Sequence, residues 1–215
     1  MRMKWMLTAL IAMGMAVPVG AAAQTKPGSQ SESQQQFDVG VSGYEMLTAA
    51  TSGLGTLETP TNAPGGMLEV RYIYKPLVGL ELNYSLSKSD TTFAPNGTAC
   101  NLVCNEPKTK LSVKDNNLAL DYVASAKLGN LRPFALAGVG FNITAAAAST
   151  YGVREVIRAA YNVGGGVDWG FLPHFGVRVQ VRDYFIKAPN NSSLYPATGV
   201  TTHGLEPMAG IYYRF

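Results

Sequence analysis

The last twelve residues of the chain alternate strictly between apolar side chains and small or polar ones. The stretch begins at Gly204 and reads GLEPMAGIYYRF. Successive side chains of a β-strand point to opposite faces, so a period of two predicts a strand whose faces meet different environments. The apolar set consists of Leu205, Pro207, Ala209, Ile211, Tyr213 and Phe215.

The same alternation recurs throughout the chain, in eight runs that include this last one. A β-strand that crosses a membrane needs about 9–11 residues at a tilt of about 45°, and each run is long enough. The runs span residues 36–47, 66–75, 78–88, 110–127, 131–145, 158–171, 174–187 and 203–215. The sequence therefore predicts an all-β fold, an eight-stranded antiparallel up-and-down barrel.

The connections between these runs alternate in length. Three are tight turns rich in Pro, Gly and Asn, and four are long. The turns cover residues 75–77, 128–130 and 172–173, and the long connections lie near residues 48–65, 89–109, 146–157 and 188–202. This rhythm is typical of outer-membrane barrels, which have short periplasmic turns and long extracellular loops. An even number of strands is expected to return both termini to the periplasm.

The N-terminal segment has the three parts of a secretory signal. Arg2 and Lys4 form a basic start, residues 6–15 an apolar centre, and small residues precede a cleavage site between Ala23 and Gln24. A membrane anchor is the alternative, but a spanning helix needs about 20 apolar residues. We therefore expect three parts: a signal peptide at 1–23, a flexible periplasmic lead-in at 24–36, and a barrel domain at 37–215.

The composition agrees with a barrel that faces lipid. Charged residues make up 14% of the chain, against about 25% in ordinary soluble domains. Without Arg2 and Lys4 the chain has 15 basic and 14 acidic residues. This balance argues against a nucleic-acid partner. No segment after the signal is long and apolar enough for a membrane helix, so a membrane protein with this sequence must be a barrel.

A soluble lipocalin-like barrel also alternates, with its apolar side inward. The composition of the two faces favours the membrane alternative. One face is densely apolar, with Leu80, Leu82, Leu118, Leu120, Val177, Val179 and Val181. The other is not rich in Lys and Glu but carries small and isolated polar residues, among them Gly138, Gly140, Asn142, Asn162, Gly164, Gly166 and Asp168. Such residues suit a narrow packed lumen, and aromatic residues near the strand ends suit an interfacial girdle.

Several motifs resemble those of a known family. Residues 131–142 read LRPFALAGVGFN, similar to the fifth strand of small OmpA-like and opacity-type outer-membrane porins. Residues 164–170 (GGGVDWG), 176–178 (GVR) and 182–184 (RDY) resemble the sixth and seventh strands of that family. The resemblance covers residues 37–215. It implies the barrel class and a C-terminal strand whose Tyr213 and Phe215 are the signal for the barrel-assembly machinery. A peptidoglycan-binding domain, which OmpA has after its barrel, is not expected.

Twelve charged residues lie at the alternate strand positions whose side chains point into the lumen, here called inward parity. An eight-stranded barrel is just wide enough for its interior side chains to fill it, and buried charges there must pair. One interpretation is a structural plug of salt bridges. The other is a gated pathway in which Arg178 or Arg182 exchanges carboxylate partners. The twelve are Asp38, Glu69, Arg71, Glu81, Asp121, Lys127, Arg132, Asp168, Arg178, Arg182, Glu206 and Arg214.

The two cysteines, Cys100 and Cys104, lie in the second long connection. In an exported chain, a close pair of cysteines predicts a disulfide, here one that closes a small ring. Two thiols with no histidine nearby fall short of the four ligands of a structural metal site. We therefore expect a disulfide and neither a metal nor a cofactor.

An enzyme would need a nucleophile and a base. His203 could meet Ser192 or Ser193, with Asp90 to orient it, but nothing in the spacing requires this. His203 is followed by Gly-Leu, so the chain lacks the His-x-Ser pattern of lipid A deacylases. The Gly138-x-Gly140 pair lies within a strand and opens no helix, so close packing explains it better than phosphate binding.

The sequence thus predicts a non-enzymatic outer-membrane protein of a Gram-negative bacterium. Its barrel would anchor four extracellular loops as a monomer. The expected partners are outer-membrane lipid, lipopolysaccharide and the barrel-assembly machinery; the sequence indicates no particular extracellular partner. A small channel or uptake barrel for ions or apolar solutes is the first alternative, and a lipid A-modifying enzyme is the second.

Overall fold

The computed structural model describes residues 36–75, 77–96, 108–146, 155–187 and 200–215. These residues form ten β-strands, and no helix among them could span a membrane. The strands are β1 (Gln36–Thr48), β2 (Thr51–Gly53), β3 (Thr56–Pro60), β4 (Ala63–Lys75), β5 (Val78–Pro95), β6 (Thr109–Ser125), β7 (Leu131–Ala146), β8 (Val156–Gly170), β9 (Phe175–Lys187) and β10 (Thr201–Arg214).

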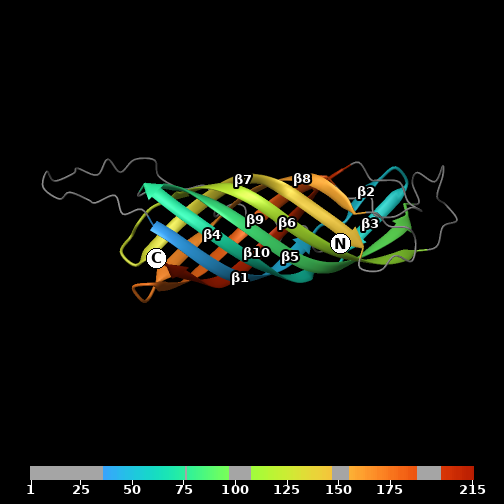
Figure 1. Cartoon of the computed structure of the whole chain (residues 1–215). Helices are drawn as coiled ribbons and strands as arrows, with labels where there is room; N and C mark the ends of the chain where they lie inside the picture. The colour runs from blue at the N-terminus through green and yellow to red at the C-terminus, as the bar shows by residue number, and fades with distance from the viewer. Residues whose placement is uncertain (1–35, 76, 97–107, 147–154, 188–199) are drawn as a thin grey trace, which may run out of the picture. The chain divides into compact units, whose positions relative to one another are not determined.

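Eight long strands close into an antiparallel barrel, as the alternation predicts. Their order around the ring is β5-β4-β1-β10-β9-β8-β7-β6, and β6 pairs with β5 again to close it. The strands run tilted around a common axis (Figure 1). The first and last strands are neighbours, with Val41 of β1 opposite Ile211 of β10. Closure leaves none of the eight long strands at an unpaired edge of the barrel, as a lipid environment requires.

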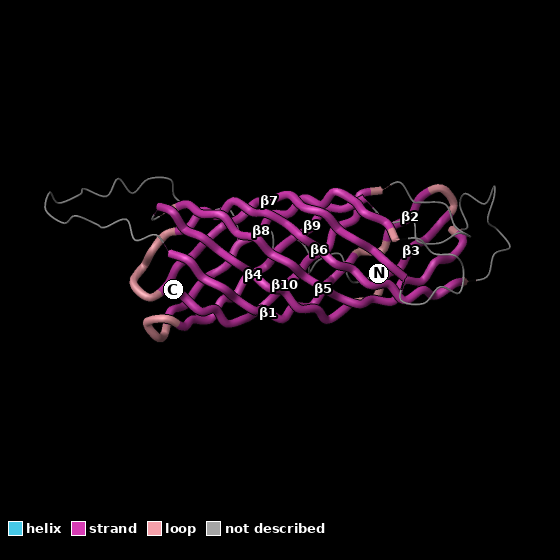
Figure 2. The backbone as a smooth tube through the Cα atoms, in the orientation of Figure 1, coloured by secondary structure: helices cyan, strands magenta, loops and turns pink. Residues whose placement is uncertain are grey.

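The barrel has two unlike ends. At one end, here called the turn end, β4, β6 and β8 finish at Lys75, Ser125 and Gly170 and pass by short turns into the next strands. β1 begins and β10 finishes at this same end, where the Phe215 amide donates to the Phe37 carbonyl over 3.0 Å. The opposite end, called the loop end, carries the extra strands β2 and β3 (Figure 2).

The first long connection is more ordered than the sequence analysis predicts. Within residues 48–65, β2 and β3 form a hairpin, and β3 pairs with the extension of β5 at Thr91–Pro95. Leu54 and Gly55 form its two-residue turn, and both have positive φ (48° and 81°), as tight hairpins prefer. The predicted long connection therefore contains two short strands that the sequence pattern does not mark. The sequence pattern does not mark β5 beyond residue 88 either, because the outward residues there, such as Asp90 and Thr92, are polar.

The apolar face of the strands points away from the barrel axis. Val179 and Leu120 are 56% and 51% exposed, whereas their inward neighbours Gln180 and Ala119 are buried. Aromatic rings gather at the turn end, where Tyr213 contacts Phe175 and Phe215 with ring centroids 5.0 and 4.9 Å away. An apolar exterior with aromatic residues at its edge is the surface that a transmembrane barrel presents to lipid.

The interior is largely polar, with small apolar clusters on either side of a charged middle. Towards the turn end Ile73, Val123, Phe134 and Leu136 pack together. Towards the loop end Tyr44, Met67 and Met208 form a second cluster. Inward glycines make room for the larger groups: a Cβ at Gly138 would collide with the Asp121 carboxylate.

Candidate functional site: a charged plug and the two ends of the lumen

The middle of the lumen holds three arginines whose side chains are at most 1% exposed. Two of them arise from simple cross-strand pairing. Arg71 of β4 lies opposite Glu81 of β5, and Arg178 of β9 lies opposite Asp168 of β8. Directly opposed residues of opposite charge attract each other within a sheet. The alternation of the sequence, once it is folded into this register, therefore brings these charges together.

Arg178 binds acids from three strands. Its Nε donates to Asp168 Oδ1 over 2.7 Å, its Nη2 to Asp38 Oδ1 over 2.9 Å, and its Nη1 to Glu69 Oε2 over 3.3 Å. The guanidinium also lies over the Tyr212 ring, 5.1 Å from its centroid. A guanidinium has five N–H donors, so one arginine can bind several carboxylates at once.

Arg71 and Arg182 continue this cluster. Arg71 lies 2.6 Å from Glu81 and 3.1 Å from Asp168, and its guanidinium stacks 4.1 Å from the Phe134 centroid. Arg182 pairs with Glu81, with Asp121 at 2.6 Å and with Glu69 at 3.2 Å. We refer to these three arginines and five acids as the plug: Arg71, Arg178, Arg182, Asp38, Glu69, Glu81, Asp121 and Asp168.

Some of these ion pairs cross the full width of the bore. Three strands separate β4 from β8 on either side of the ring, so Arg71 and Asp168 pair between opposite walls. The same holds for β9 and β5, which are joined by Arg182 and Glu81. Side chains from facing walls therefore meet inside the lumen, and the plug spans the bore.

Amide side chains complete the plug, and the sequence analysis did not single them out as partners. Asn83 and Asn162 donate to the Asp121 carboxylate over 2.7 and 2.8 Å, and Gln180 donates to Glu69. Each has the inward parity of the charged residues, with Asn83 two positions after Glu81. That parity is the sequence signal that could have identified them.

The remaining four of the twelve predicted lumen charges lie outside the plug. Among the described residues, Lys127, Arg132, Glu206 and Arg214 form no ion pair within 4.0 Å, so the twelve do not make one network. The three bases line a cavity of about 390 Å³ at the turn end. Glu206 is buried towards the loop end. The charges are thus segregated along the barrel.

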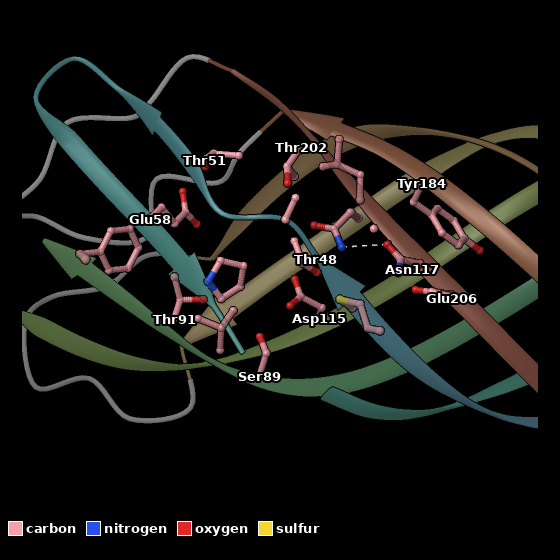
Figure 3. Close-up of a pocket in the computed structure, with 18 residues that line it drawn as sticks. Thr48, Thr51, Glu58, Ser89, Thr91, Asp115, Asn117, Tyr184, Thr202 and Glu206 are labelled. Atoms are coloured by element: carbon pink, nitrogen blue, oxygen red, sulfur yellow. Dashed lines mark hydrogen bonds between the residues drawn. The ribbon is translucent and has the colours of Figure 1, made fainter. Parts of the chain in front are cut away.

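A second cavity, here called the vestibule, lies between the plug and the loop end (Figure 3). Three acids line it: Glu58 of the hairpin, Asp115 of β6 and Glu206 of β10. Thr144 donates to Asp115 over 2.8 Å. Burial and, to a smaller extent, the charge of Asp115 raise the pKa of Glu58 to about 7, although Arg158 partly opposes this shift. The vestibule is therefore acidic, and its walls also include Met46, Pro60, Phe93, Val113 and Ile186.

Of the catalytic set that the sequence suggests, the structure describes His203 and Asp90, and these two have different partners. His203 is exposed and lies 3.3 Å from Asp183, with its ring against Phe185. Asp90 pairs instead with Lys110 at 2.9 Å and accepts a hydrogen bond from Ser112, which lowers the pKa of Asp90. Ser192 and Ser193 lie outside the described residues.

Other predicted features fall outside the part of the chain that the structure describes. These are the cleavage site at Ala23 and Gln24, nearly all of the lead-in, and the proposed Cys100–Cys104 disulfide. Within the described part, no three His, Cys, Asp or Glu residues are arranged to hold a metal ion. Tyr213 and Phe215, the predicted assembly signal, lie on the outer face at the turn end.

Comparison with known proteins gives the family. Neisserial surface protein A has a similar fold, with a TM-score of 0.57 and 14% identity over 83% of this chain and 97% of that one. OprG from Pseudomonas aeruginosa has a TM-score of 0.58 and 15% identity over 85% of this chain and 97% of that one. Ail of Yersinia pestis, solved with the heparin analogue sucrose octasulfate, has a TM-score of 0.50 and 13% identity over 84% of this chain and 99% of that one.

At these identities the likeness to solved structures concerns the fold. No curated protein matches the sequence. The family profile for the outer membrane protein beta-barrel domain, by contrast, matches residues 8–215. That match covers nearly the whole chain and agrees with the closed eight-stranded barrel and its apolar exterior. The chain therefore belongs to the outer membrane protein beta-barrel domain family, the barrels of the Gram-negative outer membrane.

Proposed function

We propose that this protein is a non-enzymatic surface anchor: a barrel closed to ions that holds four loops at the outer face of the outer membrane. The observation that carries this proposal is the set of ion pairs across the bore. Arg71 meets Asp168, and Arg182 meets Glu81, from diametrically opposite strands. A lumen that its own side chains fill in this way leaves no continuous path for a hydrated ion.

The energetics support a static plug over a gate. Arg178 has four carboxylates within 4.0 Å, and removing one partner of a buried pair typically costs about 3–5 kcal/mol. Opening a path would require several such contacts to break together. A gated pathway through Arg178 or Arg182 is therefore the less favoured function of this cluster.

Orientation in the membrane follows from the two ends. We infer that the turn end, with both barrel termini, faces the periplasm, because outer-membrane barrels have short turns there and long loops outside. The exposed aromatic residues of the turn end would then lie at the periplasmic interface. The loop end, with the β2–β3 hairpin, would face the surroundings of the cell.

The partners proposed for an anchor are few. The apolar outer face, represented by Val179 and Leu120, would contact outer-membrane lipid and, in the outer leaflet, lipopolysaccharide. Tyr213 and Phe215 would be read by the barrel-assembly machinery. Closure of the ring leaves no unpaired strand edge between β1 and β10, which is compatible with a monomer.

The experiment that tests the anchor is conductance of the refolded wild-type protein in planar lipid bilayers. A plugged barrel is expected to show small, infrequent current steps near the baseline of protein-free bilayers. Large, steady unit currents would contradict the proposal and favour the channel. Mass spectrometry of lipid A from cells that express the barrel is the parallel test for catalysis. Any change in lipid A that depends on expression would favour an enzyme.

A further inference from the structure

Glu206 is a buried acid with one unpaired carboxyl oxygen. Its side chain is in the interior with 1% exposure, and its Oε2 has no hydrogen-bond partner among the described residues. Arg182 is its direct cross-strand neighbour on β9. The Arg182 guanidinium nevertheless binds Glu69, Glu81 and Asp121, all on the plug side. A buried carboxyl without a counter-charge either holds a proton or binds a cation, so Glu206 at the cavity wall is a place where a cationic group can bind.

Figure 3 shows how the acids of the vestibule are arranged. Glu58 lies on the hairpin side, Asp115 in the middle, and Glu206 on the side of the barrel interior, beside Tyr184. The carboxylates therefore succeed one another along the cavity. None of the three forms an ion pair within the described part of the chain.

The chemistry of the walls distinguishes between kinds of cation. The described acids are not grouped closely enough to hold a metal ion. Apolar side chains, including Met46, Val113 and Ile186, line the cavity together with the carboxylates, and the threonine hydroxyls of the wall can accept hydrogen bonds. Acids spaced along a cavity whose walls are partly apolar suit ammonium groups joined by an alkyl chain better than they suit a bare ion.

The size of the cavity limits the length of such a ligand. Its volume is about 80 Å³. Roughly 10–15 Å³ of such space is enough to admit one water, so the cavity admits a ligand larger than a single water. A diamine with a four-carbon chain has six non-hydrogen atoms and is a small ligand of this kind.

We propose that the vestibule binds a short aliphatic diamine, with one ammonium donating to Glu206 Oε2 and the other to Asp115 or Glu58. This binding site goes beyond the anchor function and does not depend on it, because ligand binding above the plug leaves the bore closed. The ligand class is recognised by two positive charges and the apolar chain between them.

The test is isothermal titration calorimetry of the refolded full barrel in micelles of an uncharged detergent. The probes are 1,4-diaminobutane, 1-butylamine and the uncharged 1,4-butanediol. We expect saturable 1:1 binding of the diamine, weaker binding of the monoamine and none of the diol. Glu206→Gln should weaken diamine binding about ten- to hundredfold, the range for losing a hydrogen bond to a charged group.

Glu45→Gln is the matched control, because it removes a carboxylate that is exposed on the outer face of β1 near the same end of the barrel. This variant should bind like the wild type. Asp115→Asn is a second test variant in case Glu206→Gln does not refold, as judged by heat-modifiable mobility on gels. Three results would each overturn the proposal: no binding of the diamine, equal binding of the diol, or equal losses in Glu206→Gln and Glu45→Gln. Binding of Ca²⁺ that Glu206→Gln abolishes, without diamine binding, would assign a metal site instead.

Discussion

The plug and the vestibule are built on the same strands, yet they treat buried acids in opposite ways. In the plug all five carboxylates are within 4.0 Å of an arginine, and each arginine serves at least two of them. In the vestibule Glu58, Asp115 and Glu206 have no such partner among the described residues. β9 contributes to both regions, with Arg178 and Arg182 in the plug and then Tyr184 and Ile186 in the vestibule wall.

This difference teaches that inward parity alone does not define the role of a charge in a narrow barrel. The role of a buried acid depends on whether an arginine side chain reaches the same height along the barrel axis. Acids that meet a guanidinium become part of a rigid cross-link. Glu206, whose arginine neighbour turns towards the plug, is left available for a ligand.

The largest effect is expected from removing Arg178. Arg178→Ala leaves Asp38, Glu69 and Asp168 without one of their cations and should destabilise the barrel by about 3–5 kcal/mol. It should also raise the bilayer conductance, because the plug loses its central cross-link. Urea unfolding in micelles, followed by tryptophan fluorescence, measures the stability.

Arg214→Ala is the control for this variant, since Arg214 lies in the turn-end cavity and forms no ion pair among the described residues. It should change stability and conductance much less. Equal effects of the two substitutions would show that the plug has no special structural role.

A somewhat smaller effect tests which face of β9 meets lipid. Val179→Arg places a charge on the apolar outer face and should cost about 2–4 kcal/mol if this position lies near the bilayer midplane. Gln180→Arg, one residue away, adds the same charge inside the lumen, beside Glu69. The two variants are compared by urea unfolding in lipid vesicles of two thicknesses. The cost of Val179→Arg should depend on thickness and that of Gln180→Arg should not; the same dependence in both would refute the inside–outside assignment.

Neutralising one acid in each region compares the plug and the vestibule directly. Glu81→Gln removes a carboxylate that accepts from Arg71 and Arg182, and should cost about 1–3 kcal/mol. Glu206→Gln replaces a buried carboxyl whose Oε2 has no hydrogen-bond partner among the described residues, so stability should stay the same or rise. Both substitutions preserve side-chain size. The contrast between plug and vestibule fails if unfolding in urea shows Glu206→Gln to be as destabilising as Glu81→Gln.

Most of the fold could be predicted from the sequence because a barrel wall imposes a period of two on every strand. That period gave eight strands, three tight turns and the outward position of Val179. It also gave the inward side chains, such as Arg178. It could not give the pairing of charges, because pairing depends on the stagger between strands and on which walls face each other. Arg71 and Asp168 are 97 residues apart and meet only across the closed ring.

The hairpin at residues 51–60 escaped prediction for a different reason. Its strands lie beyond the barrel wall, so no apolar outer face marks them in the sequence. The vestibule escaped too, because it depends on this hairpin bringing Glu58 over the barrel end. Strands that cross the lipid can therefore be predicted from their apolar pattern, whereas strands beyond the lipid cannot.

The smallest expected effect concerns the pH dependence of the hairpin. The pKa of Glu58 is raised from 4.5 to about 7 in the folded state, chiefly by burial and also by Asp115 of β6, while Arg158 of β8 opposes the shift. A carboxyl with a raised pKa stabilises the folded arrangement fully below pH 4.5, and this contribution is lost as the pH rises through 7. The pairing of β3 with β5 should therefore be better protected at pH 5.5 than at pH 8. Hydrogen exchange of the β3 amides, corrected for the intrinsic effect of pH, measures this protection. Glu58→Gln should make protection nearly independent of pH, and a pH dependence that persists in this variant would assign the effect to another group.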